Sequence, residues 1–439
     1  MSTPSTKTTI DPADFVSVID NPYLPLQPGT TYVYENPGKD AFDTFIVTHD
    51  TKVIDGVTCT VIHDIAYEDG EVVEDTFDYH AQDKEGNVWY FGEDTKEFED
   101  GKVVSTEGSW RAGVDGAQPG IVMEVHPQVG DHYKQEDAPG VAEDRAKVVS
   151  FNGEADVPYG MFSDLLDTRE TNPLEPGVAE HKLYALGIGV VDGVENTGDF
   201  DHLAKIIFDG TAGADTMEGR AGKDELNGFA GNDHLNGRTG SDVAKGGRGD
   251  DVISGGNDTD ADILYGNQGH DHLYLRVGDK GYGGSGNDII TLFNPEDFGL
   301  VSGGAGGTDL AKGRGDVLEF KGELDLTHEH RGGRVSGIET IAMRGAEDRL
   351  TLSAHDILDL GSGTFDPKFS GADKLGAGDA VRIDGGHGDE VTLTGGKWHE
   401  IEATNAPDGY DVYARHTSAG DAYALVQEDV QVHLTQSVS

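Results

Sequence analysis

Aspartates recur at nine-residue intervals near the middle of the chain, and they have the type and spacing that could do chemistry. From Gly210 to Ser254, five nine-residue units follow one another without a gap, with glycine at the first and fourth places and aspartate at the sixth. A column of carboxylates repels itself unless cations lie between its members. Because flexible sites with about six to eight oxygen ligands favour Ca²⁺ over Mg²⁺, the pattern predicts a row of calcium sites. The sixth-place residues are Asp215, Asp224, Asp233, Asp242 and Asp251.

The next unit, residues 255–265, is two residues too long. Either Asp260 or Asp262 could therefore take the ligand place. We prefer Asp262 because Leu264 should then point inward, as the residue two places after the aspartate does in the other units.

Later copies are less regular. Residues 266–274 restore the pattern with Asp271, and residues 283–291 restore it with Asp288. A last, distorted copy surrounds Asp309. The number of calcium sites that are occupied after residue 255 stays open.

A spiral of short strands must position these aspartates. Glycine permits the tight turns with positive φ that other residues resist, and the eighth place of each unit supplies an inward-pointing strand residue. Nine residues make one half-turn of the spiral, so aspartates two units apart stack on the same side. One unit alone buries almost nothing, and stability must come from contacts between stacked units. The inward-pointing residues are Met217, Leu226, Leu235 and Ile253, with Ala244 as a weaker member.

Two segments carry a resemblance to a known family. GGRGDD at 246–251 and GGSGND at 283–288 match the nonapeptide of RTX proteins, G-G-x-G-x-D-x-U-x, where U is a large aliphatic residue. The resemblance implies a parallel β-roll over residues 210–311, with several Ca²⁺ ions held by sixth-place aspartates and by main-chain carbonyls of adjacent turns. The implied ligands are Asp215, Asp224, Asp233, Asp242, Asp251, Asp262, Asp271 and Asp288, with carbonyls near Gly213, Gly222, Gly231, Gly240, Gly249, Gly269 and Gly286.

The chain is strongly acidic, with 82 acidic and 32 basic residues and a net charge of −50. This balance argues against nucleic-acid binding, which needs a basic surface, and against docking to anionic lipid. High net charge opposes compaction through self-repulsion, which bound Ca²⁺ relieves, although a solvated acidic surface is also compatible with the composition. Cys59 is the only cysteine, so metal is the obvious cross-link for a chain without an intramolecular disulfide.

Features of the two ends of the chain bear on localisation. Residues 1–14 are polar and expected to be disordered, with no apolar core typical of a signal peptide, and no apolar run approaches the roughly 20 residues of a membrane span. By resemblance, RTX proteins leave the bacterial cell through a type I exporter that reads an uncleaved C-terminal signal. Residues 424–439, ALVQEDVQVHLTQSVS, are similar to such signals. We expect a secreted protein, extracellular or associated with the cell surface.

The N-terminal part reads as an all-β domain. Residues 15–194 hold segments rich in β-branched and aromatic residues, separated by DG, EG and PG breaks, which is typical of strands and turns. Residues 68–81 and 99–110 look like successive hairpins of one antiparallel meander, so we expect a curved sheet or half-barrel. The segment 21–35 resembles uncharacterised secreted bacterial β-domains, a resemblance that implies no activity. Residues 195–209 are expected to be a linker or an edge strand that enters the roll.

The C-terminal part, residues 312–439, is also expected to be β-rich, with a short helix at 353–360. It resembles modules that follow the repeats in large RTX adhesins and other type I secreted proteins, where such a module caps the roll and precedes the export signal. Capping has a physical reason, because the open end of a spiral exposes apolar core and unpaired strand edges.

The N-terminal domain offers one acid/base candidate. Glu136, Glu143 and Asp144 could converge with Tyr133, and paired carboxylates divide acid and base roles when their environments differ. Chance clusters are expected, however, in a chain with 82 acidic residues.

Other reactive residue types lack a catalytic frame. His126 and His132 lie six apart, which is not the spacing of a helical zinc pair, and they are most simply surface residues. Ser109 lacks the G-x-S-x-G frame of a nucleophile elbow. Cys59 lies in an apolar strand, where an inert buried thiol is expected.

These observations indicate a secreted, calcium-binding RTX protein whose repeats fold on Ca²⁺ binding outside the cell and support an N-terminal binding or structural domain. That domain would belong to a matrix, surface-layer or adhesion component and would contact a matrix or surface ligand. The alternative is a Ca²⁺-dependent secreted hydrolase with its active site in the N-terminal domain. The lack of a catalytic frame favours the first.

Overall fold

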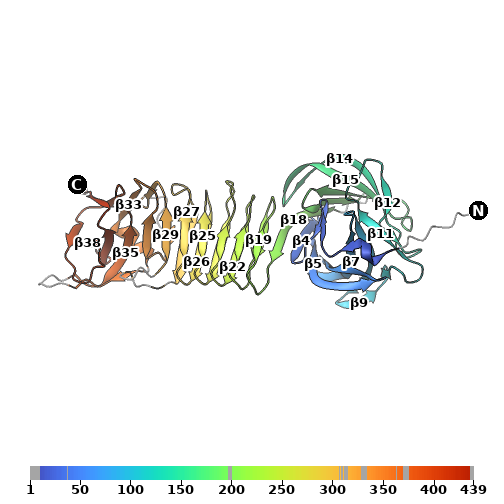
Figure 1. The fold of residues 1–439 in the computed structure, drawn as a ribbon, viewed down its shortest axis with the longest axis horizontal. Coiled ribbons are helices and arrows are strands. Elements are labelled where there is room, and N and C mark those ends of the chain that lie inside the picture. Colours follow the sequence, from blue (N-terminus) through green and yellow to red (C-terminus); the bar gives the residue numbers. More distant parts are fainter. Residues whose placement is uncertain are drawn as a thin grey trace, which may run out of the picture. The chain divides into compact units, whose positions relative to one another are not determined.

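The computed structural model of the protein is built almost entirely of strands (Figure 1). It divides into two compact units, Met1–Asp209 and Gly210–Ser439, and each is described by itself. The all-β class expected from the sequence is confirmed. The structure describes residues 10–36, 38–195, 200–305, 307, 310, 315–327, 334–361, 363–368 and 375–435.

The first unit contains a long antiparallel meander. Its hairpins turn at Asp-Gly pairs: Asp55 (φ 47°) and Gly56 (φ 85°) form the two-residue loop between paired Ile54 and Val57, and Asp69–Gly70 and Asp100–Gly101 repeat the arrangement. Two central residues with positive φ match the twist of the flanking strands. The meander strands are β4 (Thr30–Asn36), β5 (Ala41–Ile54), β6 (Val57–Glu68), β7 (Glu71–Asp83), β8 (Val88–Glu99) and β9 (Lys102–Ser105).

A second antiparallel series completes the sheet of this unit. It pairs in sequence order from β14 to β18, and β12 joins it through β14. The strands of this series are β11 (Gln118–Met123), β12 (His132–Lys134), β13 (Glu136–Asp137), β14 (Arg145–Val157), β15 (Gly160–Thr171), β16 (Glu180–Ala185), β17 (Gly189–Glu195) and β18 (Phe200–Asp209).

The two series join at both edges, so the sheet is closed where we expected a curved sheet or half-barrel. β11 pairs with β8 on one side and with β13 on the other, and β18 pairs with β4. Shorter elements lie outside this ring: η1 (Pro12–Asp14), β1 (Phe15–Val16), β2 (Ile19–Asn21), β3 (Leu24–Leu26) and β10 (Trp110–Arg111). We call the ring the closed sheet.

Of the two alternatives expected for residues 195–209, a linker or an edge strand, residues 200–209 form a strand. These residues form β18, in which Leu203 and Ile206 are fully buried and pair with Tyr34 and Tyr32 of β4. FDHLAKIIFD is rich in isoleucine and phenylalanine, which is typical of a strand, and this strand closes the sheet.

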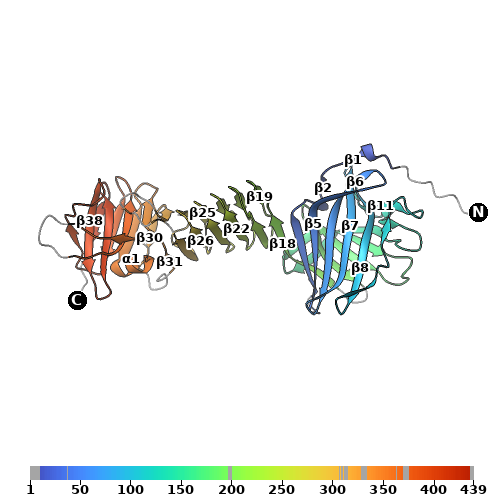
Figure 2. The same cartoon turned by 90° about the horizontal axis from the view of Figure 1, so that it is seen from below.

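The second unit is a spiral of parallel strands in two facing series. Strands two units apart pair in register, so that Met217, Leu235 and Ile253 lie side by side, and Leu235 and Ile253 have no exposed surface. One series is β19 (Thr216–Glu218), β21 (His234–Asn236), β23 (Val252–Ser254), β25 (His272–Leu275) and β27 (Ile289–Leu292). The other is β20 (Asp224–Asn227), β22 (Val243–Arg248), β24 (Ile263–Gln268), β26 (Lys280–Ser285) and β28 (Leu300–Ala305). Figure 2 shows these strands in succession.

Parallel pairing continues past residue 311, where we expected a separate cap. Ile289 pairs with Val317 in the next strand of the first series. That series goes on through β29 (Val317–Phe320), β32 (Thr340–Met343), β35 (Gly378–Asp384) and β39 (Asp421–Gln427), and β28 continues to β31 (Val335–Ser336). A further parallel sheet holds β30 (Glu323–Asp325), β33 (Arg349–Ser353), β36 (Glu390–Thr394) and β40 (Gln431–Leu434).

The described spiral ends in an antiparallel segment. β39 pairs antiparallel with β38 (Tyr410–His416), which pairs with β37 (His399–Ile401), and β34 (Thr364–Phe365) pairs with β35. The helix expected at 353–360 is α1 (Ala354–Leu360). Ser353 and Asp356 cap its start reciprocally, and Gly361 ends it in the left-handed conformation.

Among the described residues, no helix has the length and apolar composition that a membrane crossing requires.

Candidate functional site

The sixth-place aspartates lie in the turns that precede the short strands. Each donates its main-chain N–H to the carboxylate of the aspartate on the next turn of the same side, so Asp215 bonds Oδ1 of Asp233 and Asp233 bonds Oδ1 of Asp251, each at 2.8 Å. The column continues through Asp271, Asp288, Asp316 and Glu339, at 2.6–2.9 Å. The turns therefore show the stacking of residues eighteen apart that the nine-residue period predicts.

A second column lies on the other side of the spiral. Asp224 donates to Asp242 at 2.9 Å, Asp242 to Asp262 at 2.9 Å, and Asp262 to Asp279 at 3.0 Å. Asp262 takes the ladder place, as we preferred, while the main chain of Asp260 bonds the side chain of Asp258 instead.

One carboxylate oxygen in most of these turns has no hydrogen-bond partner. Among the described residues, the buried Oδ2 atoms without one include those of six turn aspartates: Asp233, Asp242, Asp251, Asp271, Asp288 and Asp316. All six residues are at most 2 % exposed. A buried polar atom without a partner is destabilising by roughly 1–3 kcal/mol, and more when charged. Their recurrence in successive turns indicates a ligand that the hydrogen bonds of the chain do not replace.

The ends of the columns differ. Oδ2 of Asp215 accepts the main-chain N–H of Thr211 at 2.6 Å, and Oδ2 of Asp279 accepts that of Arg276 at 2.7 Å. Each of the six aspartates with an unpartnered Oδ2 has a ladder neighbour on both sides.

Glycine leaves room beside the unpartnered oxygens. A Cβ added at Gly228 would lie 2.4 Å from Oδ2 of Asp233 and 2.5 Å from the carbonyl oxygen of Gly246. At Gly237 the corresponding distances are 2.3 Å to Oδ2 of Asp242 and 2.4 Å to a glycine carbonyl. Carboxylate and carbonyl oxygens thus converge where no side chain is present, which fits a hard cation.

The fourth-place glycines bring further carbonyls into the turns. Gly231 has φ 127°, and a Cβ there would lie 2.4 Å from the carbonyl oxygen of Gly213; at Gly249 the distance to the Gly231 oxygen would be 1.7 Å. The same close approach relates Gly222 to Gly240, Gly249 to Gly269, and Gly269 to Gly286. Within the described residues, no group of three or more His, Cys, Asp or Glu side chains could hold a metal ion, so a cation in a turn would draw on these carbonyls.

Burial makes the turn carboxylates difficult to ionise. Burial raises the pKa of Asp242 to about 8, a rise that the main-chain hydrogen bond from Asp224 opposes and neighbouring carboxylates increase. For the same reasons the pKa is raised to about 6 at Asp251 and to about 7 at Asp271. A divalent ion would remove the repulsion and replace the lost hydration.

Comparison with known proteins identifies this array. The family model of the RTX calcium-binding nonapeptide repeat, which spans four copies, matches residues 209–244, 236–273 and 258–279. The central part of the chain therefore consists of RTX calcium-binding repeats. Neither the comparison with curated proteins nor that with solved structures returned a match.

The RTX ladder includes acids that the sequence reading missed. Asp279 and Asp316 occupy ladder places and are 1 % and 0 % exposed, but each follows directly after a glycine, Gly278 or Gly315, in a shortened unit. GDVLEF at 315–320 carried a signal, because Leu318 lies two places after its aspartate as in a regular unit.

Asp279 carried no such signal, because its inward place is Gly281. The side chain of Leu275 fills the space there, 2.8 Å from where a Cβ would stand. Asp309, the centre of the expected last copy, lies outside the described residues.

A further pair of acids, Asp348 and Asp389, repeats the ladder bond at 2.9 Å in the sheet of β33 and β36. In these turns Oδ2 accepts main-chain N–H groups, at 2.5 Å from Gly345 and 2.7 Å from Gly386. This pair therefore has the turn geometry of the RTX repeats with its carboxylate oxygens already bonded.

In the closed sheet of the first unit, the acid/base candidates converge only in part. Burial, together with the nearby carboxyls of Glu93 and Asp144, raises the pKa of Glu136 to about 9, and Trp110 donates to Glu136 at 3.4 Å. Glu143 instead accepts the N–H of Gly140 at 3.0 Å and closes a turn.

The remaining candidates are Tyr133, the two histidines and Cys59. The buried hydroxyl of Tyr133 has no hydrogen-bond partner among the described residues, and burial raises its pKa, with the charge of Glu170 adding to the rise. His126 and His132 are exposed. Cys59 is fully buried, and burial raises the pKa of its thiol to about 12, as expected for an inert cysteine.

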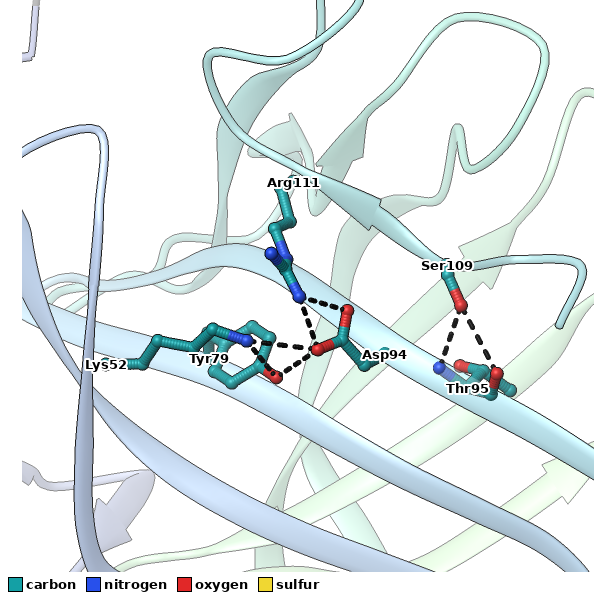
Figure 3. Close-up of polar contacts among 6 residues, drawn as sticks. All are labelled: Lys52, Tyr79, Asp94, Thr95, Ser109 and Arg111. Atoms are coloured by element: carbon teal, nitrogen blue, oxygen red, sulfur yellow. Dashed lines mark hydrogen bonds and ion pairs between the residues drawn. The ribbon is translucent and has the colours of Figure 1, made fainter.

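Ser109 has a structural partner (Figure 3). Its hydroxyl accepts the main-chain N–H of Thr95 at 2.9 Å and donates to the Thr95 carbonyl at 3.3 Å. These bonds hold the segment before β10 against β8.

Asp94 joins three elements in the same region (Figure 3). It accepts from Arg111 at 2.6 and 2.7 Å, from Lys52 at 3.0 Å and from the Tyr79 hydroxyl at 2.7 Å. Burial alone would raise the pKa of Asp94, but these hydrogen bonds lower it to about 2. Every charge in the network is paired, so it fastens β10 to β5, β7 and β8 and offers no reactive group.

Proposed function

We propose that this protein is secreted and that its repeats fold when Ca²⁺ binds between successive turns. The proposed ligands are the carboxylates of Asp215, Asp224, Asp233, Asp242, Asp251, Asp262, Asp271 and Asp288, joined by Asp279 and Asp316 and by carbonyls near the fourth-place glycines. The observation that carries the proposal is the set of six turn aspartates whose buried Oδ2 atoms lack a hydrogen-bond partner. One divalent ion between neighbouring turns would bind these atoms and cancel the repulsion within a column.

Coupling of binding to folding follows from the same charges. Without the cation, compaction must desolvate a column of carboxylates in a chain of net charge −50, so the extended chain is favoured. Binding energy then becomes folding energy. In a bacterial cytosol poor in free Ca²⁺ the repeats would stay unfolded and exportable, and they would fold outside the cell.

Type I export is the route we propose. It is supported by the RTX repeats and by the acidic, hydroxyl-bearing residues 424–439, of which 436–439 lie outside the described residues. In this scheme the spiral, including strands β29 to β40, is the part that Ca²⁺ organises.

For residues 15–194 we propose a binding role at a matrix or cell surface. The support is a closed sheet that buries polar side chains such as Asp78 and His80, together with the main-chain hydrogen bonds that engage the hydroxyl of Ser109. The second candidate is a Ca²⁺-dependent hydrolase, which the meeting of Glu136 with Asp144 favours. The two proposals differ in turnover of esterase, phosphodiesterase, glycosidase and protease substrates. A binding domain should turn over none of them. Turnover that is abolished by Glu136→Gln but retained in Glu143→Gln would establish the hydrolase.

Circular dichroism of the full chain tests the calcium proposal. In EGTA the strand signal of residues 210–435 should be reduced, because only part of the population stays folded. Millimolar Ca²⁺ should restore it in one cooperative step, whereas Mg²⁺ at the same concentration should not. Identical spectra in EGTA and Ca²⁺ would refute it.

A further inference from the structure

The closed sheet encloses a cavity of about 200 Å³ at the strands β4, β5, β6 and β16 to β18. Its wall combines acidic and apolar side chains. The acidic part comprises Asp43, Asp64, Glu180 and Asp201, and the single basic residue is Lys182. Concave sites of this kind, mostly apolar with a few converging polar groups, are where small ligands bind.

Lys182 is already paired. Its ammonium lies 3.1 Å from Glu170 and 3.3 Å from Glu180, and Glu170 is held in turn by Gln135 at 3.0 Å and Thr168 at 3.2 Å. This buried network fixes one side of the cavity and engages the Lys182 ammonium with Glu170 and Glu180.

Asp43 and Asp64 are the two carboxylates of the cavity whose negative charge no described partner neutralises. They lie on the same face of adjacent strands, since Asp64 pairs in register with Phe45, two residues from Asp43. Among the described residues, neither side chain has a hydrogen bond or an ion pair. Burial raises the pKa of Asp43 to about 7, with Asp201 and Glu74 adding to the rise. Burial also raises that of Asp64, with Asp78 and Asp43 adding.

The opposite part of the wall is apolar and aromatic. Leu24, Leu26, Tyr32 and Phe45 line the cavity together with Val190. A metal ion prefers about six or more oxygen ligands around it, which this half of the wall does not provide. An organic cation uses both halves, since aromatic faces attract cations and aliphatic side chains bury an apolar body.

We propose that this cavity binds a small organic ammonium ion, with its charge against Asp43 and Asp64 and its apolar body against Phe45 and Leu26. The ligand neutralises two carboxylates that the chain leaves unpaired. This inference names the ligand class for the binding role proposed for residues 15–194, and it does not depend on the calcium sites of the second unit.

Three probes of nearly the same shape and different charge test the charge preference: benzylammonium, benzyl alcohol and benzoate. Binding is measured by isothermal titration calorimetry on the full chain in saturating Ca²⁺ at pH 8, with methylammonium as a smaller cation. We expect benzylammonium to bind at least tenfold more tightly than benzyl alcohol, and benzoate not to bind.

Matched variants locate the site. Asp64→Asn should weaken benzylammonium binding at least tenfold, while Asp50→Asn, an exposed position on the same strand as Asp43, should leave it unchanged. The thermal midpoint of Asp64→Asn, followed by circular dichroism, should equal or exceed that of the original protein because the variant removes a buried charge.

Three results would overturn the inference: equal binding of the amine and the alcohol, equal binding by Asp64→Asn, or no binding of either ammonium ion. None of them bears on Ca²⁺-induced folding, which reports on residues 210–435. Turnover of a hydrolase substrate would contradict the proposed binding role separately.

Discussion

Replacement of Asp233 by asparagine removes one negative charge from a buried RTX turn and leaves its shape unchanged. The amide oxygen of asparagine can still accept the 2.8 Å hydrogen bond that Asp215 N now donates to Asp233 Oδ1. The unpartnered Oδ2 becomes an NH₂ group, which cannot bind a cation. Asp233→Asn should therefore weaken the Ca²⁺-bound repeats.

The expected magnitude follows from the number of coupled sites. An interaction with a charged group is worth roughly 1.5–3 kcal/mol, so the unfolding free energy in saturating Ca²⁺ should fall by about that amount. If about six ions bind, one for each turn aspartate with an unpartnered Oδ2, the loss is shared among about six binding steps. The Ca²⁺ midpoint of folding should then rise only about twofold.

In EGTA the effect should change sign. Without a cation, the buried Asp233 carboxylate destabilises the folded repeats, because burial and the charge of Asp215 disfavour its ionised form and raise its pKa. Asp233→Asn should then be at least as resistant to urea as the original chain. Asp215→Asn is the matched comparison at the edge of the array, since Oδ2 of Asp215 already accepts a main-chain hydrogen bond, and its loss of stability in Ca²⁺ should be smaller than that of Asp233→Asn.

Urea unfolding of the three proteins in EGTA and in 5 mM Ca²⁺, roughly a saturating concentration for extracellular calcium modules, provides the assay. An equal loss of stability by Asp233→Asn in both conditions would show that the carboxylate has a purely structural role. An equal loss by Asp215→Asn and Asp233→Asn in Ca²⁺ would refute the reasoning from the unpartnered oxygens.

Three further predictions concern the pH dependence of stability, the crowding caused by a side chain at a glycine position, and how far the calcium sites continue along the spiral. Because the folded-state pKa values of the turn carboxylates are raised above the unfolded value of about 4, stability in EGTA should be present below about pH 4 and lost as pH rises through about 8, the value for Asp242. In Ca²⁺ the urea midpoint should instead rise from pH 5 to pH 8, since the metal binds deprotonated carboxylates, and a parallel pH dependence in the two conditions would contradict this. Gly237→Ala places a Cβ 2.3 Å from Oδ2 of Asp242 and should destabilise the Ca²⁺ form by about 1–3 kcal/mol. The control Gly376→Ala, whose Cβ meets nothing within 4 Å, should leave stability unchanged. Equal effects of the two substitutions would count against the crowding argument. Asp316→Asn should behave like Asp233→Asn in both conditions, and a variant with unchanged calcium stoichiometry and stability would limit the calcium sites to the regular repeats.

The sequence was informative where its pattern was local. Nine-residue spacing determines which residues stack, so the column of Asp215, Asp233 and Asp251 was predictable, as was the inward place of Leu235. The helix at 353–360 was predictable for the same reason, since Ser353 and Asp356 form a capping box within one turn.

Features that depend on distant pairings were not predictable in this way. Closure of the N-terminal sheet requires β4 to meet β18, whose residues Leu203 and Ile206 are far from Tyr34 and Tyr32 in the chain. The polar residues preceding β18 left a linker and an edge strand as alternatives for this segment. Likewise, the meeting of Glu136 with Glu93 depends on how β8 and β13 join through β11.

The shortened units show a third limit of prediction from the sequence. At Asp279 the inward place is glycine and a neighbouring leucine fills it, so the apolar signal of a repeat is absent although the ladder bond is made. The apolar period identifies a unit only where its own residue fills the core.

Anomalous diffraction from crystals of the full chain grown with Ca²⁺ tests the central claim most directly. The account predicts a calcium peak beside the unpartnered Oδ2 of each of Asp233, Asp242, Asp251, Asp271, Asp288 and Asp316, at about 2.3–2.6 Å from that oxygen. Turns that show the same carboxylate geometry with no calcium peak beside them would contradict it.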